Sequence, residues 1–343
     1  MATSVQLDWH AIPSLEGVER RWAALRSHGG ALTANLICRV NDAGDAERVA
    51  AFLAQIGPRH PSRIFLVSPG REGADMEARV AAQSPGSEFV QIGIAPERAR
   101  SLVQPLLAAD LPVVLLWRSE GANEGELAQW SAIADQVLLD AYRMGLSAEQ
   151  LEQLQRKLGD HISVRDLTWT RLTPWRQLLC QGLETMPDAW GEIAQVSITS
   201  GHRRQGERPG LATTLLAGWL GHQLQWVSEG LQVHSPSGKK IGLRFGACPA
   251  EEKHGLFRRL VVECDGPKQG LSVVIQHRGE RLTLDVHSGT RKLGEWSSPA
   301  VGELRSQVDT LDEELSVGGG DPLYQASLKR GVALLAGLGG AAR

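Results

Sequence analysis

The chain has 343 residues, of which 42% are hydrophobic and 22% are charged, an ordinary balance for a globular protein of about two domains. Its formal net charge of -3 argues against a nucleic-acid-binding protein that works through overall basicity. It contains no run of about 18 apolar residues and no apolar core of a signal peptide near its N-terminus, so we expect a cytoplasmic protein without a membrane span.

An α/β pattern fills residues 31–158, after a short amphipathic helix predicted at 15–27. Strand-like runs at 32–40 and 62–67 flank a helix at 45–56 that begins with an Asp cap, which is the order expected of a parallel sheet. The next predicted elements are strands at 76–83 and 88–95 around a turn, a helix from Pro96 to about Ala108, a strand at 111–117, a helix at 124–132, a strand at 135–141 and a helix from Ser147. We expect an α/β domain over 1–160, with an antiparallel insertion in its sheet.

The pattern changes in residues 161–343. A strand at 192–199 and a helix at 209–226 lead into segments of alternating polarity, and helices at 301–316 and 321–337 close the chain. The residues predicted to face a core are Ile241, Leu243, Phe245, Ala247, Leu282, Leu284 and Val286. The opposite face carries Arg244, Thr283, Asp285 and His287. We expect an α+β domain with an antiparallel sheet, one face buried and the other open to water or a partner.

A search for catalytic signatures finds none: neither H-E-x-x-H nor G-x-S-x-G occurs. Gly238 and Lys239 lack the earlier glycine of a phosphate loop, because Val233 stands in its place. The glycine-rich strings SVGGGDP and LAGLGGAAR follow helices instead of joining a strand to a helix. The first domain therefore reads as a Rossmann-like mixed sheet without its phosphate loop, and we expect no cofactor.

The residues that often bind metals are scattered. The four cysteines, Cys38, Cys180, Cys248 and Cys264, form no C-x-x-C pair and are expected to be buried, reduced thiols. A hairpin of 241–248 with 256–264 would hold the last two of them too far apart for a disulfide. The ten histidines are dispersed, so no metal site is expected. The carboxylates of 311–315, with Arg305 upstream, read as a solvated helix face.

One electropositive loop precedes the helix predicted at 209–226. It contains Arg203, Arg204 and Arg208, and Pro209 suits a first helical turn, where anions are attracted to the helix N-terminus. The loop is either a solvated segment or a site for an anion or an acidic partner.

The segment "DLTWTRLTPWRQLLCQGLE" (166–184) concentrates large and charged side chains. Thr173 reads as a helix cap, Pro174 as the first helical residue, and Trp169 as part of an extended lead-in. Trp175 begins an apolar stripe along the helix. Two hypotheses follow: both tryptophans anchor the helix between the domains, or the segment faces a partner. The candidate partner-binding residues are Trp169, Arg171, Thr173, Pro174, Trp175 and Arg176.

The stretch "DLTWTRLTPWRQLL" strongly resembles the signature of the OpcA family, the glucose-6-phosphate dehydrogenase assembly proteins of cyanobacteria, actinobacteria and other bacteria. Three more stretches resemble the family in the same order: "HPSRIFLV" (60–67), "LVQPLLAADLPVVLLWR" (102–118) and "LLAGWLGHQLQW" (215–226). A weaker likeness lies in "LDEELSVGGGDPLYQASL" (311–328).

The resemblance implies a non-catalytic assembly factor or allosteric activator of glucose-6-phosphate dehydrogenase, which supports NADPH production in the oxidative pentose phosphate pathway. It carries no catalytic residue to this chain, in agreement with the search above. Family members in phototrophs are associated with thiol-linked control, and this property is not carried over to the present chain, because its four cysteines form no close pair. The alternative is a sugar-phosphate-binding enzyme or sensor that uses the loop of Arg203, Arg204 and Arg208.

Overall fold

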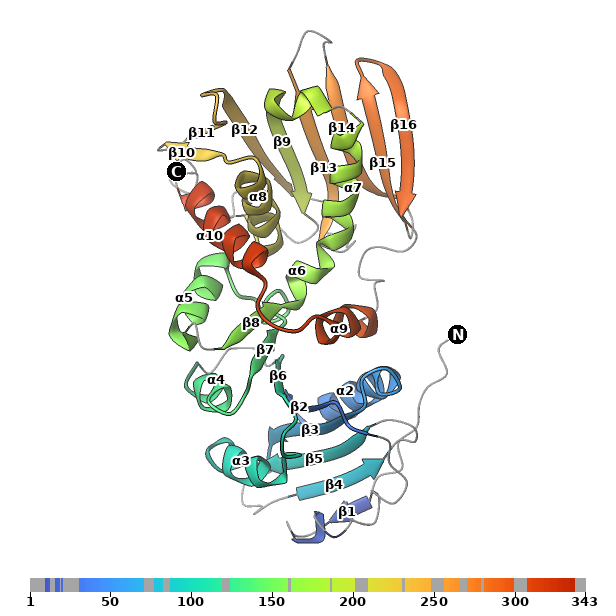
Figure 1. Ribbon diagram of the computed structural model, residues 1–343, viewed down its shortest axis with the longest axis vertical. Coiled ribbons are helices and arrows are strands. Elements are labelled where there is room, and N and C mark those ends of the chain that lie inside the picture. The colour runs from blue at the N-terminus through green and yellow to red at the C-terminus, as the bar shows by residue number, and fades with distance from the viewer. Residues whose placement is uncertain are drawn as a thin grey trace. The chain divides into compact units, whose positions relative to one another are not determined.

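A computed structural model of the chain divides it into two compact units (Figure 1). Unit 1 comprises Met1–Gly145, Gln153–Leu167 and Gln307–Gly320, and unit 2 comprises Leu146–Glu152, Thr168–Ser306 and Asp321–Arg343. The structure describes residues 10–12, 16–18, 20, 31–70, 77–82, 87–118, 124–159, 162–185, 187–200, 209–229, 232–247, 256–265, 270–278, 281–298 and 307–336. Of the helix predicted at 15–27, residues 16–18 and 20 are described and helical.

Unit 1 is built on an eight-stranded mixed sheet in the order β1-β4-β5-β3-β2-β6-β7-β8. Its strands are β1 (His10–Ile12), β2 (Ala34–Arg39), β3 (Ser62–Pro69), β4 (Glu77–Ala82), β5 (Glu88–Ile94), β6 (Val113–Trp117), β7 (Gln136–Leu139) and β8 (Ser163–Asp166). Strands β5, β3, β2, β6, β7 and β8 run parallel to their neighbours, whereas β4 is antiparallel to β5 and to β1. The expected mixed sheet is confirmed, and β4 is the antiparallel insertion.

The helices between these strands are α2 (Ala43–Ile56), α3 (Pro96–Val103), the 3₁₀ turn η2 (Gln104–Leu106), α4 (Glu124–Ser131) and α5 (Ala148–Leu158). The first part of α5, residues 148–152, belongs to unit 2. Two boundaries differ from the sequence-based expectation. Helix α2 is capped by Asp42, whose side chain accepts a hydrogen bond from the Asp45 amide at 2.7 Å. Helix α3 stops before Ala108, because Pro105 lacks an amide N–H and the chain tightens into the 3₁₀ turn.

A helix from the far end of the chain completes unit 1. Helix α9 (Gln307–Ser316) places Leu311, fully buried, in one hydrophobic cluster with residues of α2 and the sheet, and Val308 and Leu315 pack against the same cluster. The three apolar residues follow helical spacing, which predicts a buried stripe but not the surface that the stripe covers. The expected boundaries of 1–160 and 161–343 therefore differ from the observed units, because 307–320 belongs with the first sheet.

Unit 2 contains a second eight-stranded sheet, in the order β10-β11-β12-β9-β13-β14-β15-β16. Its strands are β9 (Ile193–Ser200), β10 (Val227–Glu229), β11 (Gln232–His234), β12 (Lys240–Ala247), β13 (Phe257–Cys264), β14 (Leu271–Arg278), β15 (Arg281–Ser288) and β16 (Arg291–Ser298). Strand β9 lies between β12 and β13 and runs parallel to β12.

The expectation of an antiparallel sheet was therefore wrong in one place, and so was the hairpin of 241–248 with 256–264. Both of those strands pair with β9 instead of with each other. The reason is the helix between β9 and β12, α8 (Leu211–Gln223), which supplies the crossover that a parallel pair needs. Periodicity within a strand does not reveal which earlier strand it joins.

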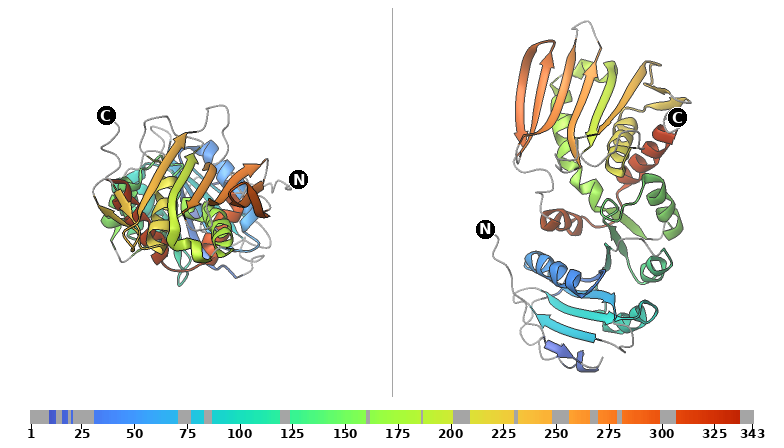
Figure 2. Two further views of the ribbon diagram at one scale, coloured as in Figure 1. Left: turned by 90° about the horizontal axis from the view of Figure 1, so that it is seen from above. Right: turned by 180° about the vertical axis from the view of Figure 1, so that it is seen from behind.

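The helices of unit 2 gather on one side of its sheet (Figures 1 and 2). They are α6 (Leu167–Arg171), α7 (Thr173–Glu184), the 3₁₀ segment η3 (Pro187–Glu192), α8 and α10 (Pro322–Ala336). Helices α8 and α10 touch backbone to backbone: a Cβ added at Gly218 would lie 1.9 Å from the Ser327 carbonyl oxygen. Of the helices in the described part of the chain, none combines the length and the apolar composition needed to span a bilayer.

The helix-covered face of this sheet confirms part of the predicted alternation. Ile241, Leu282, Leu284 and Val286 are buried, whereas Leu243 and Phe245 are half-buried and Ala247 is exposed. On the opposite face, Thr283 and Asp285 are also buried. Asp285 is enclosed by two long cross-strand cations, because Arg278 reaches it at 3.0 Å and Lys292 at 2.6 Å.

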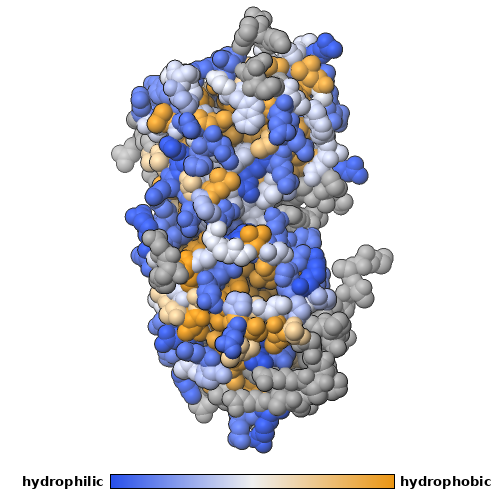
Figure 3. Space-filling view, in the orientation of Figure 1, coloured by the Kyte–Doolittle hydropathy of each residue, from blue (hydrophilic) through white to orange (hydrophobic). Residues whose placement is uncertain are grey.

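Over unit 2, the side shown in Figure 3 mixes polar and apolar side chains. Among the described residues, the large hydrophobic side chains that are exposed are Val227, Leu293, Trp296 and Val317. Leu293 and Trp296 lie on β16 and Val227 on β10, all in unit 2, whereas Val317 follows α9 in unit 1.

Candidate functional site

The segment 166–184 is helical from Leu167 onward. Helix α6 runs almost directly into α7, and the residue between them, Leu172, has right-handed helical dihedrals. The predicted cap at Thr173 and the extended lead-in at Trp169 are therefore wrong. A capping residue normally has extended dihedrals, and here the preceding turn of α6 already occupies that position. Thr173 instead accepts a hydrogen bond from Arg176 at 3.0 Å.

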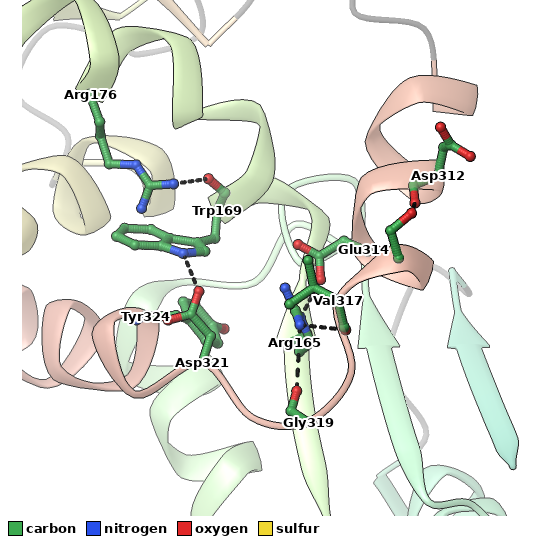
Figure 4. Close-up of polar contacts among 10 residues, drawn as sticks. Arg165, Trp169, Arg176, Asp312, Glu314, Val317, Gly319, Asp321 and Tyr324 are labelled. Carbon is green, nitrogen blue, oxygen red and sulfur yellow. Dashed lines mark hydrogen bonds and ion pairs between the residues drawn. The ribbon is translucent and has the colours of Figure 1, made fainter.

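Trp169 holds together two distant stretches of unit 2 (Figure 4). Its indole Nε1 donates a hydrogen bond to Asp321 at 2.8 Å. The Arg176 guanidinium lies 3.4 Å from the centroid of its ring, and Tyr324 lies at 5.9 Å on another side. The stack is a cation–π contact whose cation, Arg176, comes from the following helix α7. This tryptophan is 4% exposed.

Asp321 serves two groups at once. One carboxylate oxygen receives the Trp169 indole N–H, and the other accepts the Tyr324 amide at 2.9 Å, which caps helix α10. Sequence reasoning missed this residue. The signal was present in "GGGDPLY", where Asp precedes Pro322 at the start of a helix.

Trp175 lies on the opposite side of α7, against the sheet. Its ring meets Phe257 edge to face, with centroids 5.2 Å apart, and lies 5.7 Å from the His277 ring. It is 1% exposed. Both tryptophans therefore fix α6 and α7 to other elements of unit 2, because each packs its bulk against them. Anchoring of the helix between the two domains stays a prediction.

The six predicted partner-binding residues divide into two groups by exposure. Trp169, Pro174 and Trp175 are buried, and Arg171, Thr173 and Arg176 are half-buried. The role of the segment in binding a partner stays a prediction, and among the six only the three half-buried side chains have surface to offer it.

A matching arrangement lies in unit 1, at the end of α9 (Figure 4). Arg165, on β8, forms an ion pair with Glu314 and donates hydrogen bonds to the carbonyl oxygens of Val317 at 2.8 Å and Gly319 at 3.5 Å. Because both charges are buried, each depends on the other for neutralisation. Two of the places where the chain passes from one unit to the other are Leu167/Thr168 and Gly320/Asp321. Arg165 and Trp169 thus fasten the residues that flank these two passages, each inside its own unit.

The acidic helix face predicted for 311–315 is a second correction. Asp312 accepts hydrogen bonds from Arg59 at 2.5 Å and from the His60 ring at 2.9 Å, and its side chain is only 20% exposed. Glu314 is buried against Arg165. These carboxylates face basic residues of unit 1 because α9 docks there. Arg305 lies outside the described residues.

Unit 1 has the sheet order that creates a ligand crevice in open α/β folds. Strand β2 has β3 on one side and β6 on the other, so the chain order reverses at its carboxyl end. The last residue of β2, Arg39, donates a hydrogen bond to Glu126 of α4 at 2.6 Å and contacts the Val40 and Val67 carbonyl oxygens. Both charged side chains are less than a tenth exposed.

At the N-terminus of α2, the helix that follows β2, carboxylates already accept hydrogen bonds from backbone amides. Asp42 accepts the Asp45 amide, and the Asp45 carboxylate accepts the Asn41 amide at 3.3 Å. A bound pyrophosphate needs free backbone N–H donors and a positive field at this helix N-terminus. Here two carboxylates occupy that end of α2, and their charge repels a phosphate.

The predicted anion-binding residues, Arg203, Arg204 and Arg208, lie outside the described residues. The helix after them, α8, begins at Leu211 with Gly210 as its cap, so Pro209 precedes the helix instead of lying in its first turn.

The thiols within the described residues are poorly suited to redox chemistry. Burial raises the pKa of Cys38 to about 12 and that of Cys264 to about 11. Burial and the Glu184 carboxylate also raise the pKa of Cys180. Because the thiolate is the reactive form, these residues react slowly near neutral pH. In the part of the chain that the structure describes, no three His, Cys, Asp or Glu side chains gather as a metal site requires. Cys248 lies outside that part.

Comparison with protein families finds two matches, which together span most of the chain. Residues 54–156 match the model described as the N-terminal domain of the glucose-6-phosphate dehydrogenase subunit. Residues 162–328 match the model described as the C-terminal domain of the same subunit. Both models carry the OpcA name.

A curated relative points the same way. The chain is 29% identical over 189 residues to a protein of Synechocystis sp. described as the OxPP cycle protein OpcA. The alignment covers 50% of this chain and 38% of that protein, so the chain matches well under two thirds of its relative's length.

Among solved structures, the chain is similar to KijD10, a 3-ketoreductase from Actinomadura kijaniata that was crystallised with NADP and TDP-benzene. The TM-score is 0.51 at 11% identity, with 89% of this chain and 96% of that chain covered. An open conformation of the same enzyme gives the same values. At this identity the likeness shows a fold with a Rossmann-like oxidoreductase neighbour, and nothing about activity.

Proposed function

The chain belongs to the OpcA family, and on that premise we propose that it is a non-catalytic partner of glucose-6-phosphate dehydrogenase that promotes the assembly or the active state of that enzyme. Its setting is then the oxidative pentose phosphate pathway and the supply of NADPH, in the cytoplasm. The enzyme carries out the hydride transfer, and this chain changes how much of the enzyme is competent to do so.

The observation that carries the proposal is the match of both halves of the chain to family models described as domains of a subunit of that dehydrogenase. A match confined to the Rossmann-like half would fit many unrelated enzymes, since this fold hosts many functions. The C-terminal match over 162–328 includes the Trp169 to Trp175 segment and all eight strands of the unit 2 sheet.

The closed crevice of unit 1 supports a role without hydride transfer. An enzyme of this fold holds its dinucleotide at the carboxyl end of the strand that corresponds to β2 by position. In this chain the buried Arg39–Glu126 pair and the two carboxylates of α2 stand there. Opening the site would separate a buried ion pair, which is strongly destabilising.

Activation needs only a modest preference for one state of the enzyme. A partner shifts a conformational or oligomeric equilibrium by its difference in affinity for the two states. A tenfold increase in a small active fraction corresponds to about 1.4 kcal/mol of such a preference. A few well-packed contacts suffice for this, so a large interface is not required.

The direct test mixes the purified chain with glucose-6-phosphate dehydrogenase from the same organism. We expect the two to co-elute in gel filtration, the rate of NADP reduction to rise, and this chain alone to show no turnover. The co-elution and the rate are then compared between the natural chain and Arg171→Ala. The control variant is Val317→Ala, which changes an exposed side chain of unit 1. Failure to co-elute, together with an unchanged rate over a concentration series, would sink the proposal.

A further inference from the structure

Among the described residues, one face of the unit 2 sheet carries no helix of that unit. The helices lie on the other face, and the view from behind in Figure 2 looks onto strands. We define the open face as the side chains of β12, β9, β13, β14, β15 and β16 that point away from the helices. Because residues paired across strands share a face, the observed registers arrange these side chains in rows.

Three rows cross the six strands. The middle row reads Arg244, Ser197, Val261, Val274, Asp285, Glu295. The row on one side of it reads Gly246, Thr199, Arg259, Gln276, Thr283, Ser297. The row on the other side reads Gly242, Gln195, Glu263, Ser272, His287, Lys292. Most members of the rows are small or polar, with two valines at the centre.

The open face is large enough for a specific interface. Each of the six strands has eight residues. At about 4.8 Å between strands and 3.3 Å per residue, the face measures about 24 by 26 Å, or roughly 600 Å² before side-chain relief. A standard protein interface buries about 800 Å² on each partner, so this one face is of the right order.

The charges of the middle row are separated along it. Arg244 stands at the β12 end, and within the described part of the chain it forms no ion pair. Asp285 and Glu295 stand at the β15 and β16 end, and they share Lys292 at 2.6 Å each. The apolar centre with charged ends is the anatomy of an interface core and rim.

A two-fold axis parallel to the strands, between β13 and β14, makes this pattern complementary to itself. Such an axis lays β12 of one copy over β16 of the other, so that Arg244 faces Glu295. The same rotation lays Val261 over Val274 at the centre. In the flanking rows it lays Arg259 over Gln276 and Glu263 over Ser272, so within the three rows no two like charges meet.

The alternative two-fold axis, across the strands, is unfavourable. It sets Arg244 against its own copy and Glu295 against its own copy. Like charges brought together at an interface cost several kcal/mol and act against that register. The charge order along the middle row therefore selects one of the two face-to-face arrangements.

We propose that the open face of the unit 2 sheet docks a second copy of this chain, around a two-fold axis parallel to the strands and centred on Val261 and Val274. Small residues at Ser197, Thr199 and Ser272 let two such faces approach to the separation of about 10 Å found in packed sheets. This dimer does not depend on the proposed role towards the dehydrogenase.

The first experiment measures the mass of the full-length chain by sedimentation equilibrium over a concentration series. We expect a dimer for the natural sequence and a monomer for Val261→Arg, which places a charge at the centre. Val227→Arg is the matched control, because Val227 is an exposed valine of unit 2 on β10, outside the three rows, and it should remain dimeric. Circular dichroism and melting temperature establish that each variant is folded.

A charge exchange then tests the register. Arg244→Glu and Glu295→Arg should each weaken the dimer by about tenfold, and the double variant should recover most of that loss, because it restores opposite charges across the axis. No recovery in the double variant overturns the arrangement. A natural chain that is monomeric up to about 100 μM, well above the μM affinities of weak specific complexes, overturns the proposal. So does a Val261→Arg variant that stays dimeric, or one that loses only capture by the dehydrogenase.

Discussion

The two sheets of this protein have the same number of strands, but they differ in how many of their faces are covered by other parts of their unit. In unit 1, strands β2, β3, β5, β6 and β7 are buried almost throughout, so both faces of the sheet are covered. In unit 2, the described helices cover one face, and the other face carries rows of small, polar and charged side chains. Three arginines of unit 1, Arg39, Arg63 and Arg165, are buried with carboxylates. On the open face of unit 2, Arg244 and Arg259 are exposed, and Asp285 is buried between Arg278 and Lys292.

At the place where an enzyme of this fold binds a dinucleotide, unit 1 holds the buried Arg39–Glu126 ion pair. In unit 2, the face of the sheet without described helices is the surface that we propose for contact with a second copy. Four predictions and one expected absence of effect test this division, from the largest change to the smallest.

The largest effect should come from Trp169→Ala. The substitution removes a buried ring, its stack with Arg176 and its hydrogen bond to Asp321, and we expect a loss of about 3–5 kcal/mol in the free energy of unfolding. Trp169→Phe keeps a ring and loses the hydrogen bond to a charged group, so it should cost about 1.5–3 kcal/mol. Urea denaturation measures both. A Trp169→Ala protein that unfolds like the natural one, yet fails to bind the dehydrogenase, would move this residue to the interface.

Glu126→Ala should destabilise unit 1 by about 3–5 kcal/mol, because it leaves Arg39 buried without its carboxylate. In unit 2, Glu192→Ala removes a partner of Lys239 from a pair whose carboxylate is half exposed, and should change stability by at most about 1 kcal/mol. Thermal melts of the two variants give the comparison. Equal effects would contradict the view that the charges of unit 1 are structural.

A smaller effect, about 1.4 kcal/mol, is expected from linkage between substrate and partner. If this chain tightens binding of glucose 6-phosphate to the dehydrogenase by about tenfold, the sugar phosphate must tighten the complex by the same factor. Titration of the complex with and without saturating substrate measures this. A lowered dissociation constant for the substrate, with no matching gain in affinity between the proteins, rules out activation by that route.

Alkaline pH should weaken the fold gradually. The pKa of the Cys38 thiol is raised from 9.0 to about 12 by burial, so the folded state holds its proton more tightly than the unfolded state. The resulting stabilisation is fully present below pH 9 and is lost as the pH rises from 9 towards 12. Denaturation midpoints across this range should fall for the natural chain and fall less for Cys38→Ala. At about pH 8, below the raised pKa values, Cys38 and Cys264 should resist thiol reagents until the protein unfolds.

The last prediction is that NADP does not bind to this chain. The full-length chain should give no heat of binding with NADP at micromolar concentration, because the carboxyl end of β2 is closed by Arg39 and Glu126 and the start of α2 carries two carboxylates. Glucose-6-phosphate dehydrogenase in the same calorimeter is the positive control. Micromolar binding that is lost in an Asp42→Arg variant would reveal an open nucleotide site and contradict this interpretation.

The local pattern of hydrophobic and polar residues in the sequence determined many of the helices, strands and core residues of this protein. The strand at 62–67, the helix that ends near Ile56, the antiparallel pair around 84–87 and the two C-terminal helices are all found near their predicted places. Alternation also identified Leu282, Leu284 and Val286 as core residues. These features depend on interactions between residues a few positions apart, and such interactions leave a period in the sequence.

Tertiary structure alone decided which elements meet. Nothing in the spacing of Val308, Leu311 and Leu315 says that their helix covers α2, nor does the alternation of 241–247 say that β12 pairs with β9. Glu314 was predicted to be a solvated surface charge, and it is instead buried against Arg165, more than a hundred residues away. The sequence predicted no partner for Asp321, and the fold brings it against Trp169, also more than a hundred residues away. A side chain's partner across the fold is chosen by packing and by the need to neutralise buried charge, and both depend on distances that the order of residues does not contain.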